Sequence, residues 1–391
     1  MFTPELDTAK ICPDTTLVAY SEIALKSRHV RRYLENLLVQ HVRASLRLRG
    51  IEFDDVLKQS GRIFVIGGEP YHISKSLCDI FGIEYSCPVI RTQVTLEAIR
   101  EVSLKLASSL FDLNDSFAID ARRTGTHSFT SKDLENEIGA SVLKELGAER
   151  KLRVDLENPR KSIFIEVRDK DAFVFSNIDR GVGGLPYGSQ GKILTLLLGD
   201  EKSTVANWLM MKRGSAVTPI HISFPGEDNL LHRAVAQAEL LKKFVPSQRL
   251  SLLIAPLRGL DEFSKKHGLL ETAALRVCIS LEIALETARK IGAFGLATAD
   301  SELSAVFADS VSYTTFETRY VPIYYPLLGL GHEEVAKLAQ RIGVTEFEGY
   351  PEVSSLNARE LVSVRNLLGE TAVKDMILNA VNQTEKINVL P

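Results

Sequence analysis

A glycine-rich linker, an apolar run and a helix follow one another between residues 181 and 214. The apolar run at residues 193–198 has the composition of a strand buried in a parallel sheet, and a helix is predicted from about residue 203 to residue 212. Phosphates usually bind in the loop of such a unit, because backbone N–H groups and the positive end of the helix dipole converge there. The segment therefore predicts a nucleotide-binding α/β domain whose first loop is residues 198–203.

Two carboxylates, Asp200 and Glu201, lie in this predicted phosphate loop. A phosphate cradle needs small residues so that backbone N–H groups can approach the ligand, and it accommodates fixed negative charge poorly. A carboxylate at about 4 Å from a phosphate charge costs on the order of 4 kcal/mol at an effective dielectric of about 20, unless Mg²⁺ or Lys202 offsets it. Alternatively, Asp200 is an N-cap and Glu201 a first-turn acid, and both stabilise the helix without a ligand. The residue types favour this second interpretation.

Strands and helices alternate strictly after residue 214. Such alternation implies a parallel sheet with helices on both faces, and ligands of such sheets bind at the carboxyl ends of the strands. The predicted strands are residues 217–222, 250–254, 295–298 and 321–323, the predicted helices are residues 231–244, 269–291 and 333–342, and the chain is expected to end in short helices.

The segment before residue 86 predicts a split βαβ, ferredoxin-like module. Strands are expected at residues 16–20, 52–57 and 62–67, a second helix from residue 73, and a long amphipathic helix from residue 28 to a stop at Gly50. The cations of the long helix and of the residues before it are either a solvated face or contacts to the phosphates of an RNA. The candidates for RNA contact are Lys26, Arg28, Arg31 and Arg32.

A second module is predicted between residues 86 and 180. Its helices are expected at residues 96–110 and 131–146, with a capping arrangement at residues 131–135, and its strands at residues 117–122, 152–156, 163–167 and 172–177. Basic residues gather in the loop that is expected before the second helix. Loop arginines next to glycine are good phosphate ligands, although an exposed basic loop without a ligand would look the same. The RNA-contact candidates here are Arg122, Arg123, His127 and Lys132.

Composition excludes several classes of protein. The 391 residues are 45% hydrophobic and 25% charged, which is typical of a soluble protein of two or three domains, and no long apolar stretch predicts a membrane span. No secretory pattern opens the chain, so a cytoplasmic location is expected. The four cysteines lack metal-ligand spacing, so no metal site is expected. The net charge of -3 argues against a uniformly basic surface but allows local basic patches.

Three motifs resemble one known family, the ThiI tRNA 4-thiouridine sulfurtransferases. The GVGGLP linker at residues 181–186 and the LMMKRG segment at residues 209–214 resemble the opening of its PP-loop domain, and SEIALKS at residues 21–27 resembles its N-terminal signature. Residues 86–180 resemble a THUMP domain. The resemblance implies an N-terminal ferredoxin-like domain at residues 1–85, a THUMP RNA-binding domain at 86–180 and a doubly wound, parallel-sheet PP-loop domain at 181–391, in a chain that binds the acceptor end of tRNA.

The sequence departs from the family at its chemical positions. The family's Ser-Gly-Gly-x-Asp-Ser loop reads LGDEKS here, and two serines stand where the family has paired cysteines. A serine hydroxyl cannot form a persulfide or a disulfide. A rhodanese-like extension is not expected either. By alignment, the nucleotide contacts would be Leu196, Leu197, Gly199, Lys202, Ser203, His221 and Ile222, and the serines at the cysteine positions are Ser354 and Ser355.

Two functions of different classes follow from the resemblance. In one, the chain is a working ATP-dependent tRNA sulfurtransferase that uses ATP and Mg²⁺ with a variant phosphate loop. In the other, it is a non-catalytic tRNA-binding paralogue or partner subunit that needs no cofactor, and the substituted loop and cysteine positions favour this second function. The resemblance also implies a cysteine desulfurase or an active paralogue as a protein partner, and a homodimer.

Overall fold

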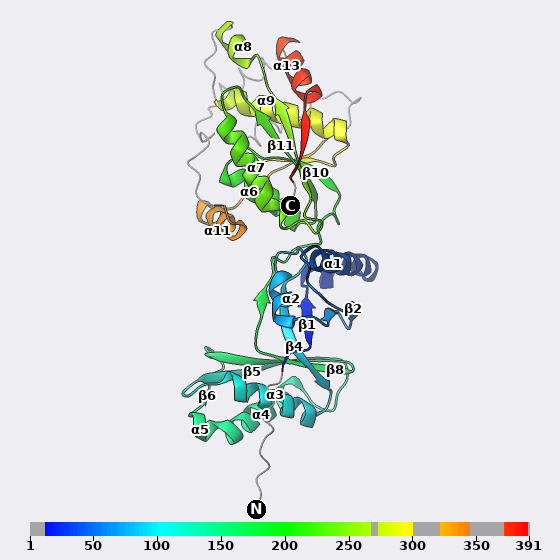
Figure 1. The fold of residues 1–391 in the computed structure, drawn as a ribbon, viewed down its shortest axis with the longest axis vertical. Coiled ribbons are helices and arrows are strands. Elements are labelled where there is room, and N and C mark those ends of the chain that lie inside the picture. The colour runs from blue at the N-terminus through cyan, green and yellow to red at the C-terminus, as the bar shows by residue number, and fades with distance from the viewer. Residues whose placement is uncertain (1–11, 267–272, 300–320, 345–370, 390–391) are drawn as a thin grey trace, which may run out of the picture. The chain divides into compact units, whose positions relative to one another are not determined.

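The computed structural model describes residues 12–266, 273–299, 321–344 and 371–389, which fall into two compact units, Met1–Gly183 and Gly184–Pro391. Each unit is built on one sheet (Figure 1). No helix in the described ranges is long and apolar enough to cross a membrane.

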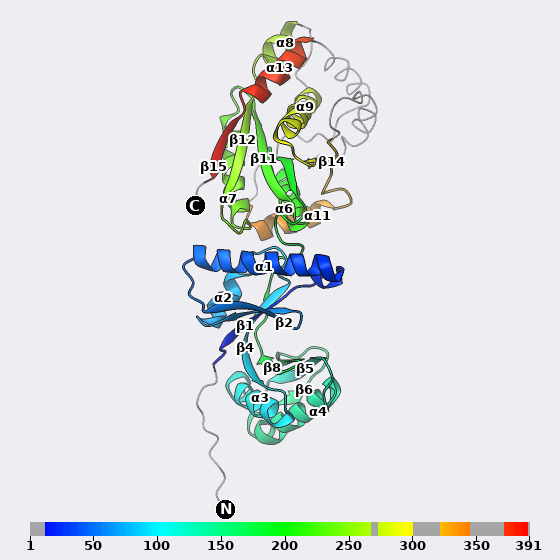
Figure 2. The same ribbon diagram turned by 90° about the vertical axis from the view of Figure 1, so that its right-hand side faces the viewer.

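The first half of unit 1 has the predicted ferredoxin-like order. Strand β1 (Thr15–Ala19) lies between β3 (Arg62–Ile66) and β4 (Tyr85–Gln93), and β2 (Asp55–Gln59) forms the edge. Helix α1 (Arg28–Leu48) follows a short 3-10 turn, η1 (Glu22–Leu25), and α2 (Pro70–Ser76) follows β3. The apolar stripe of α1 is buried against the sheet, as its periodicity predicts (Figure 2).

The second half of unit 1 continues the same sheet through β4. The order beyond β4 is β8 (Asp171–Phe175), β7 (Lys161–Arg168), β5 (Ser116–Thr124) and β6 (Arg153–Val154), and β9 (Asp179–Arg180) also pairs with β4. Helices α3 (Leu96–Leu110) and α4 (Ser131–Val142) cover this part, and α4 continues through a π turn, η2 (Leu143–Gly147), into α5 (Ala148–Arg150). Phe64 and Phe173 stack with ring centroids 4.7 Å apart, so the two halves share one apolar cluster.

The structure corrects three local predictions in unit 1. Strand β4 was not predicted. It pairs with β1 in the first half of the sheet and with β8 in the second half, and the expected domain boundary between residues 85 and 86 falls at its start. Arg122 lies in β5, as the predicted strand at residues 117–122 requires, but Arg123 also lies in β5 rather than in a loop, because β7 pairs with β5 as far as Thr124. The N-cap of α4 is Thr130, whose hydroxyl accepts from the N–H of Asp133 at 3.1 Å, and not Ser131.

Unit 2 is doubly wound, as predicted. Its sheet has the order β14 (Ile323–Tyr324), β13 (Leu296–Ala297), β10 (Lys192–Leu196), β11 (Ala216–Ser223), β12 (Leu250–Pro256) and β15 (Glu385–Val389). Helix α9 (Ala273–Ile291) lies on one face of this sheet and α7 (Asp228–Lys242) on the other (Figure 2). The other helices of unit 2 in the described ranges are α6 (Glu201–Lys212), α8 (Leu260–Lys266), α11 (His332–Ile342) and α13 (Thr371–Asn382).

The last strand differs from the prediction. The chain was expected to end in short helices, but β15 follows α13 and pairs antiparallel with β12, from Leu250↔Val389 to Ile254↔Glu385. Most of its residues are exposed and two are charged, so it lacks the apolar run that marks the other strands. The five remaining strands are parallel to one another.

Candidate nucleotide and RNA sites

The crevice of unit 2 is defined by the order of its strands. Strand β10 lies between β11 and β13, and β13 follows β12 in the chain, so the strand order reverses at β10. Ligands of open α/β sheets bind outside the carboxyl ends of strands at such a point. The loop that follows β10, residues 197–200, and the start of α6 therefore occupy the position where a nucleotide's phosphates would lie.

Asp200 is the N-cap of α6, as the sequence predicts. Its carboxylate accepts a hydrogen bond from the backbone N–H of Ser203 at 2.8 Å, and Glu201 is the first-turn acid of the same helix. A carboxylate in this position stabilises the helix start by its hydrogen bond and by its interaction with the dipole. The donor that a phosphate would use at the third position of the helix is thus already bound by the chain itself.

Other groups of the loop also form internal hydrogen bonds. The hydroxyl of Ser203 accepts from Leu198 N at 3.1 Å and donates to the carbonyl oxygen of Asp200 at 3.2 Å. The same carbonyl oxygen accepts from Thr204 Oγ1 at 3.0 Å and from Gln237 Nε2, on α7, at 2.9 Å. Side chains of two helices, α6 and α7, therefore hold the backbone of the loop.

Gly199 serves packing in this loop. It has a φ of +86°, and a Cβ at this position would lie 2.8 Å from the carbonyl oxygen of Leu230 and 3.3 Å from Cβ of Arg233. Glycine is needed both for the left-handed backbone and for the close approach of α7. Its presence in the loop is therefore explained without a phosphate ligand.

A buried polar network behind the loop was not foreseen from the sequence. The amide of Asn207 donates to the carbonyl oxygens of Leu196 and Ser203, both at 2.8 Å, and its oxygen accepts from the hydroxyl of Thr195. Thr195, Ser203 and Asn207 are all buried. Buried polar side chains need hydrogen-bond partners. The polar residues Thr195, in an apolar strand, and Asn207, in the helix that follows, could therefore have indicated this network.

The predicted nucleotide contacts cluster around this loop, but most of them are enclosed. The side chains of Leu196, Leu197 and Ile222 belong to the core, whereas Lys202 is exposed on α6. His221 is buried, and its Nδ1 donates to the carbonyl oxygen of Leu197 at 2.9 Å. Burial lowers the pKa of His221, so the imidazole is neutral. The role of all the predicted contact residues in nucleotide binding remains a prediction.

The loop places the Asp200 carboxylate on the N-terminus of α6, and Gln237 of α7 donates to the carbonyl oxygen of Asp200. Within the described ranges there is also no group of three or more His, Cys, Asp or Glu side chains that could hold a metal ion. Ser354 and Ser355 lie outside the described residues.

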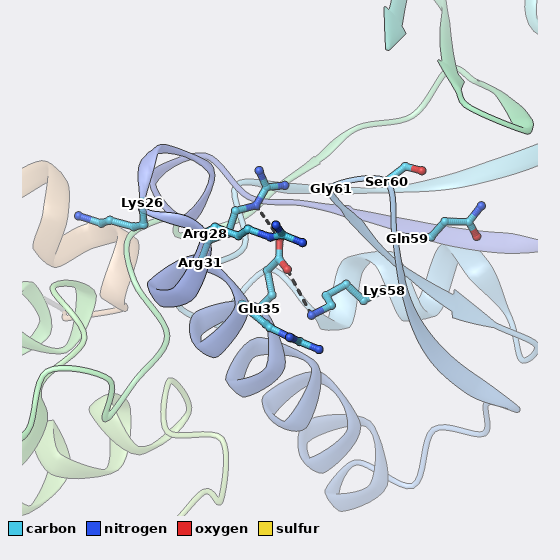
Figure 3. Close-up of a pocket in the computed structure, with 9 residues that line it drawn as sticks. Lys26, Arg28, Arg31, Glu35, Lys58, Gln59, Ser60 and Gly61 are labelled. Carbon is cyan, nitrogen blue, oxygen red and sulfur yellow. Dashed lines mark hydrogen bonds and ion pairs between the residues drawn. The ribbon is translucent and has the colours of Figure 1, made fainter. Parts of the chain in front are cut away.

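In unit 1, the structure brings together all four basic candidates from the start of the long helix. They line one open pocket of about 520 Å³, here called the basic pocket, at the start of α1 and the β2–β3 turn (Figure 3). Sequence reasoning missed the other members, although Glu35 lies four residues after Arg31, a helical ion-pair spacing. The lining residues are Lys26, Arg28, Arg31, Arg32, Glu35, Lys58, Gln59, Ser60 and Gly61.

The centre of the basic pocket is the buried carboxylate of Glu35. Arg31 Nε lies 2.7 Å from Oε1 and Lys58 Nζ lies 3.3 Å from Oε2, and the hydroxyl of Tyr20 also donates to Glu35. Burial alone would raise the pKa of Glu35, but the hydrogen bonds from Tyr20, Arg31 and Lys58 lower it. Burial, and next the hydrogen bond to Glu35, raise the pKa of Tyr20 to about 12. Glu35 is therefore ionised at neutral pH.

None of the four candidates from the second module lines the basic pocket. Arg122 lines a separate pocket of about 180 Å³ and pairs with Asp120 at 3.6 Å. Arg123 donates to the carbonyl oxygen of Gly125 at 3.1 Å. His127 donates to the carbonyl oxygen of Thr124 at 3.1 Å and stacks on Phe129, and Lys132 pairs with Glu135 at 3.3 Å. Arg168 links the two sets of basic residues, because its Nη1 donates to the carbonyl oxygen of Ser60 at 3.2 Å and to Thr124 Oγ1 at 3.1 Å.

Comparisons with known proteins agree with this three-part organisation. Residues 15–87 match the ThiI ferredoxin-like domain, residues 93–177 match the THUMP domain, and residues 188–356 match the thiamine biosynthesis protein (ThiI). A solved structure of a 4-thiouridine synthetase, 22% identical, covers 96% of this chain and 100% of its own with a TM-score of 0.72, which shows the fold.

Curated relatives share most of their length with this chain. A probable tRNA sulfurtransferase of Methanosarcina acetivorans is 32% identical over 87% of this chain and 83% of its own length. One from Thermococcus kodakarensis is 32% identical over 87% of this chain and 90% of its own length. Identity at this level over nearly full length, in the same domain order, shows that this chain belongs to the ThiI family of tRNA sulfurtransferases.

Proposed function

We propose that this chain is a tRNA-binding member of its family whose PP-loop-like unit does not bind the phosphates of ATP. It would act as a non-catalytic paralogue or as a partner subunit of an active enzyme. The observation that carries the proposal is the hydrogen bond from Ser203 N to the carboxylate of Asp200, because the chain's own anion occupies the helix end where a phosphate would bind.

The energetic argument concerns charge in the loop. A phosphate placed at the start of α6 would lie next to the carboxylates of Asp200 and Glu201, and one such contact costs on the order of 4 kcal/mol at about 4 Å. Opening the loop would also break the hydrogen bond from Gln237 to the carbonyl oxygen of Asp200. Both effects weaken ATP binding while leaving the fold intact.

RNA binding is supported by unit 1. Its basic pocket and the exposed Arg122 place cations on a chain whose net charge is only -3, so the positive charge is local. The similar 4-thiouridine synthetase was solved in complex with RNA. We infer that unit 1 binds the acceptor end of tRNA through phosphate contacts.

The alternative is an active ATP-dependent tRNA sulfurtransferase with a variant loop. It is favoured by the strand, loop and helix that are present at the carboxyl end of β10, by the names of the relatives, and by the ATP bound in the similar synthetase. In this case Lys202 and Mg²⁺ would have to offset the two carboxylates of the loop.

Calorimetric titration with ATP and Mg²⁺, with and without bulk tRNA, tests the proposal. We expect clear tRNA binding and no ATP binding in either titration. Micromolar ATP binding would overturn the non-catalytic function and lead to an assay of 4-thiouridine formation. Absence of tRNA binding would overturn the RNA-binding part.

A further inference from the structure

We propose that the basic pocket is a preorganised site for the phosphates of an RNA backbone, in which Glu35 is a positioning residue that acts through Arg31. Five cationic side chains and one carboxylate line this pocket. The inference rests on the proposed function, because it names the part of the RNA that unit 1 would hold there.

The start of α1 carries charges that oppose helix stability. Arg28, Arg31 and Arg32 lie within the first five residues of the helix, and no acidic residue lies in its first turn. Cations are unfavourable at the positive end of a helix dipole, where anions are preferred. Sequences break such local rules mainly at functional sites, so this arrangement points to an anionic ligand at the helix start.

Glu35 fixes the direction of Arg31. Arg31 Nε donates to Glu35 Oε1 at 2.7 Å and Arg31 Nη2 donates to the hydroxyl of Tyr20 at 3.3 Å, so two of the three guanidinium nitrogens are held. Lys58 reaches the same carboxylate from another side (Figure 3). An arginine whose orientation is already held loses less conformational entropy when it binds a phosphate.

The pocket retains positive charge after these pairings. In the part of the chain that the structure describes, the side chains of Lys26, Arg28 and Arg32 have no ion-pair partner, and all three are exposed. Lys26 points away from Glu35, so it would meet a phosphate other than the one at Arg31 (Figure 3). A polyanion with successive phosphates fits this spread of cations better than a single small anion does.

Gly61 in the β2–β3 turn is the second support of Arg31. Its φ is +76°, and a Cβ there would lie 2.9 Å from Nη2 of Arg31 and 4.0 Å from the hydroxyl of Tyr20. A side chain at this position would therefore displace the guanidinium without changing the charge of the pocket. Gly50, with a φ of +65° and nothing within 4 Å of a Cβ, provides a control with the same backbone strain.

The substitution Glu35→Gln separates positioning from charge. Removal of a negative charge beside bound phosphates would tighten RNA binding if Glu35 only repelled them. If Glu35 positions Arg31, binding of bulk tRNA should instead weaken about fivefold, and the slope of log K against log salt should fall by about one, because one phosphate contact is lost. Unchanged or tighter binding by a folded Glu35→Gln variant would overturn its positioning role.

Gly61→Ala and Gly50→Ala form the matched pair. Bulk tRNA is titrated at KCl concentrations between about 50 and 200 mM, and circular dichroism shows that each variant is folded. We expect Gly61→Ala to reproduce the weaker binding and smaller slope of Glu35→Gln, and Gly50→Ala to bind like the unmodified chain. Equal behaviour of the two alanine variants would overturn the pocket as an RNA-phosphate site.

Thermal stabilisation by inorganic pyrophosphate at constant ionic strength distinguishes the two proposals. If the unmodified chain does not bind tRNA but pyrophosphate stabilises it more than it stabilises Gly61→Ala, the proposed function and the RNA occupant of the pocket both fail, and the positioning of Arg31 for a phosphate stands. If tRNA does not bind and pyrophosphate has the same effect on both chains, the pocket is overturned as well.

Discussion

The side-chain amide of Asn207 in α6 donates a hydrogen bond to the carbonyl oxygen of Leu196, the last residue of β10, at 2.8 Å. The same amide reaches the carbonyl oxygen of Ser203 at 2.8 Å. A single buried side chain thus joins the end of the central strand to the first turn of the helix that follows it. These hydrogen bonds hold both ends of the loop in place, whether or not a ligand is bound to it.

Replacement of Asn207 by alanine should destabilise unit 2. Asn207 is 1% exposed, and alanine removes its side-chain hydrogen bonds to two carbonyl oxygens and to the hydroxyl of Thr195. We expect a loss of about 2–4 kcal/mol in the free energy of unfolding measured in urea. The exposed Asn379 in α13, changed to alanine as a control, should alter stability by less than about 0.5 kcal/mol.

Replacement of Asp200 by serine should test the charge of the loop. Serine is also a good N-cap, so α6 keeps its start while the carboxylate is removed. If the charge of Asp200 excludes ATP, calorimetry should show ATP affinity rising at least about tenfold. As a control, the exposed Asp375 of α13 changed to serine should leave the affinity for ATP unchanged. If Asp200→Ser also leaves it unchanged, the charge of Asp200 is not what excludes ATP.

The stability of unit 1 should fall as the pH is lowered through the range set by His41. Burial lowers the pKa of His41 from 6.5 to about 4, and its Nδ1 has no hydrogen-bond partner among the residues that the structure describes. The unfolded chain therefore binds a proton at a higher pH than the folded chain does. The resulting loss begins near pH 6.5, ends near pH 4 and amounts to about 3 kcal/mol.

Denaturant unfolding at several pH values, followed in the unmodified chain and in His41→Leu, measures this effect. The variant should lose most of the pH dependence in that window. A leucine at the exposed His29 of the same helix should leave it unchanged. If His41→Leu retains the full dependence, other groups are responsible.

Joint replacement of Arg122 and Arg123 by alanine should weaken tRNA binding and reduce its salt slope by about two, if both contact phosphates. Arg122 is well exposed, with 68% of its side chain accessible, so its loss should not affect folding. Arg100, on α3, pairs with Glu137 at 3.8 Å and lines neither of the two RNA-candidate pockets, which makes Arg100→Ala a suitable control. Unchanged affinity and slope in the double variant would remove both arginines from the RNA site.

The kinds of elements and their order could be predicted from local patterns. The amphipathic helix with its stop at Gly50, the alternating strands and helices of unit 2 and the cap at Asp200 all depend on residues that are close in sequence. Strand β15 could not be predicted in this way, because an exposed edge strand carries no apolar period and becomes a strand only by pairing with β12.

The same distinction applies to the sites. By itself, the sequence determined the family, the substituted phosphate loop and the basic start of α1, since these are properties of residue types at short spacing. Only the tertiary structure decided that Tyr20, which follows β1, and Lys58 of β2 bond to Glu35, and that Gln237 of α7 bonds to the loop at Asp200. Such contacts join residues far apart in the chain, so they exist only once burial and sheet pairing have brought their elements together.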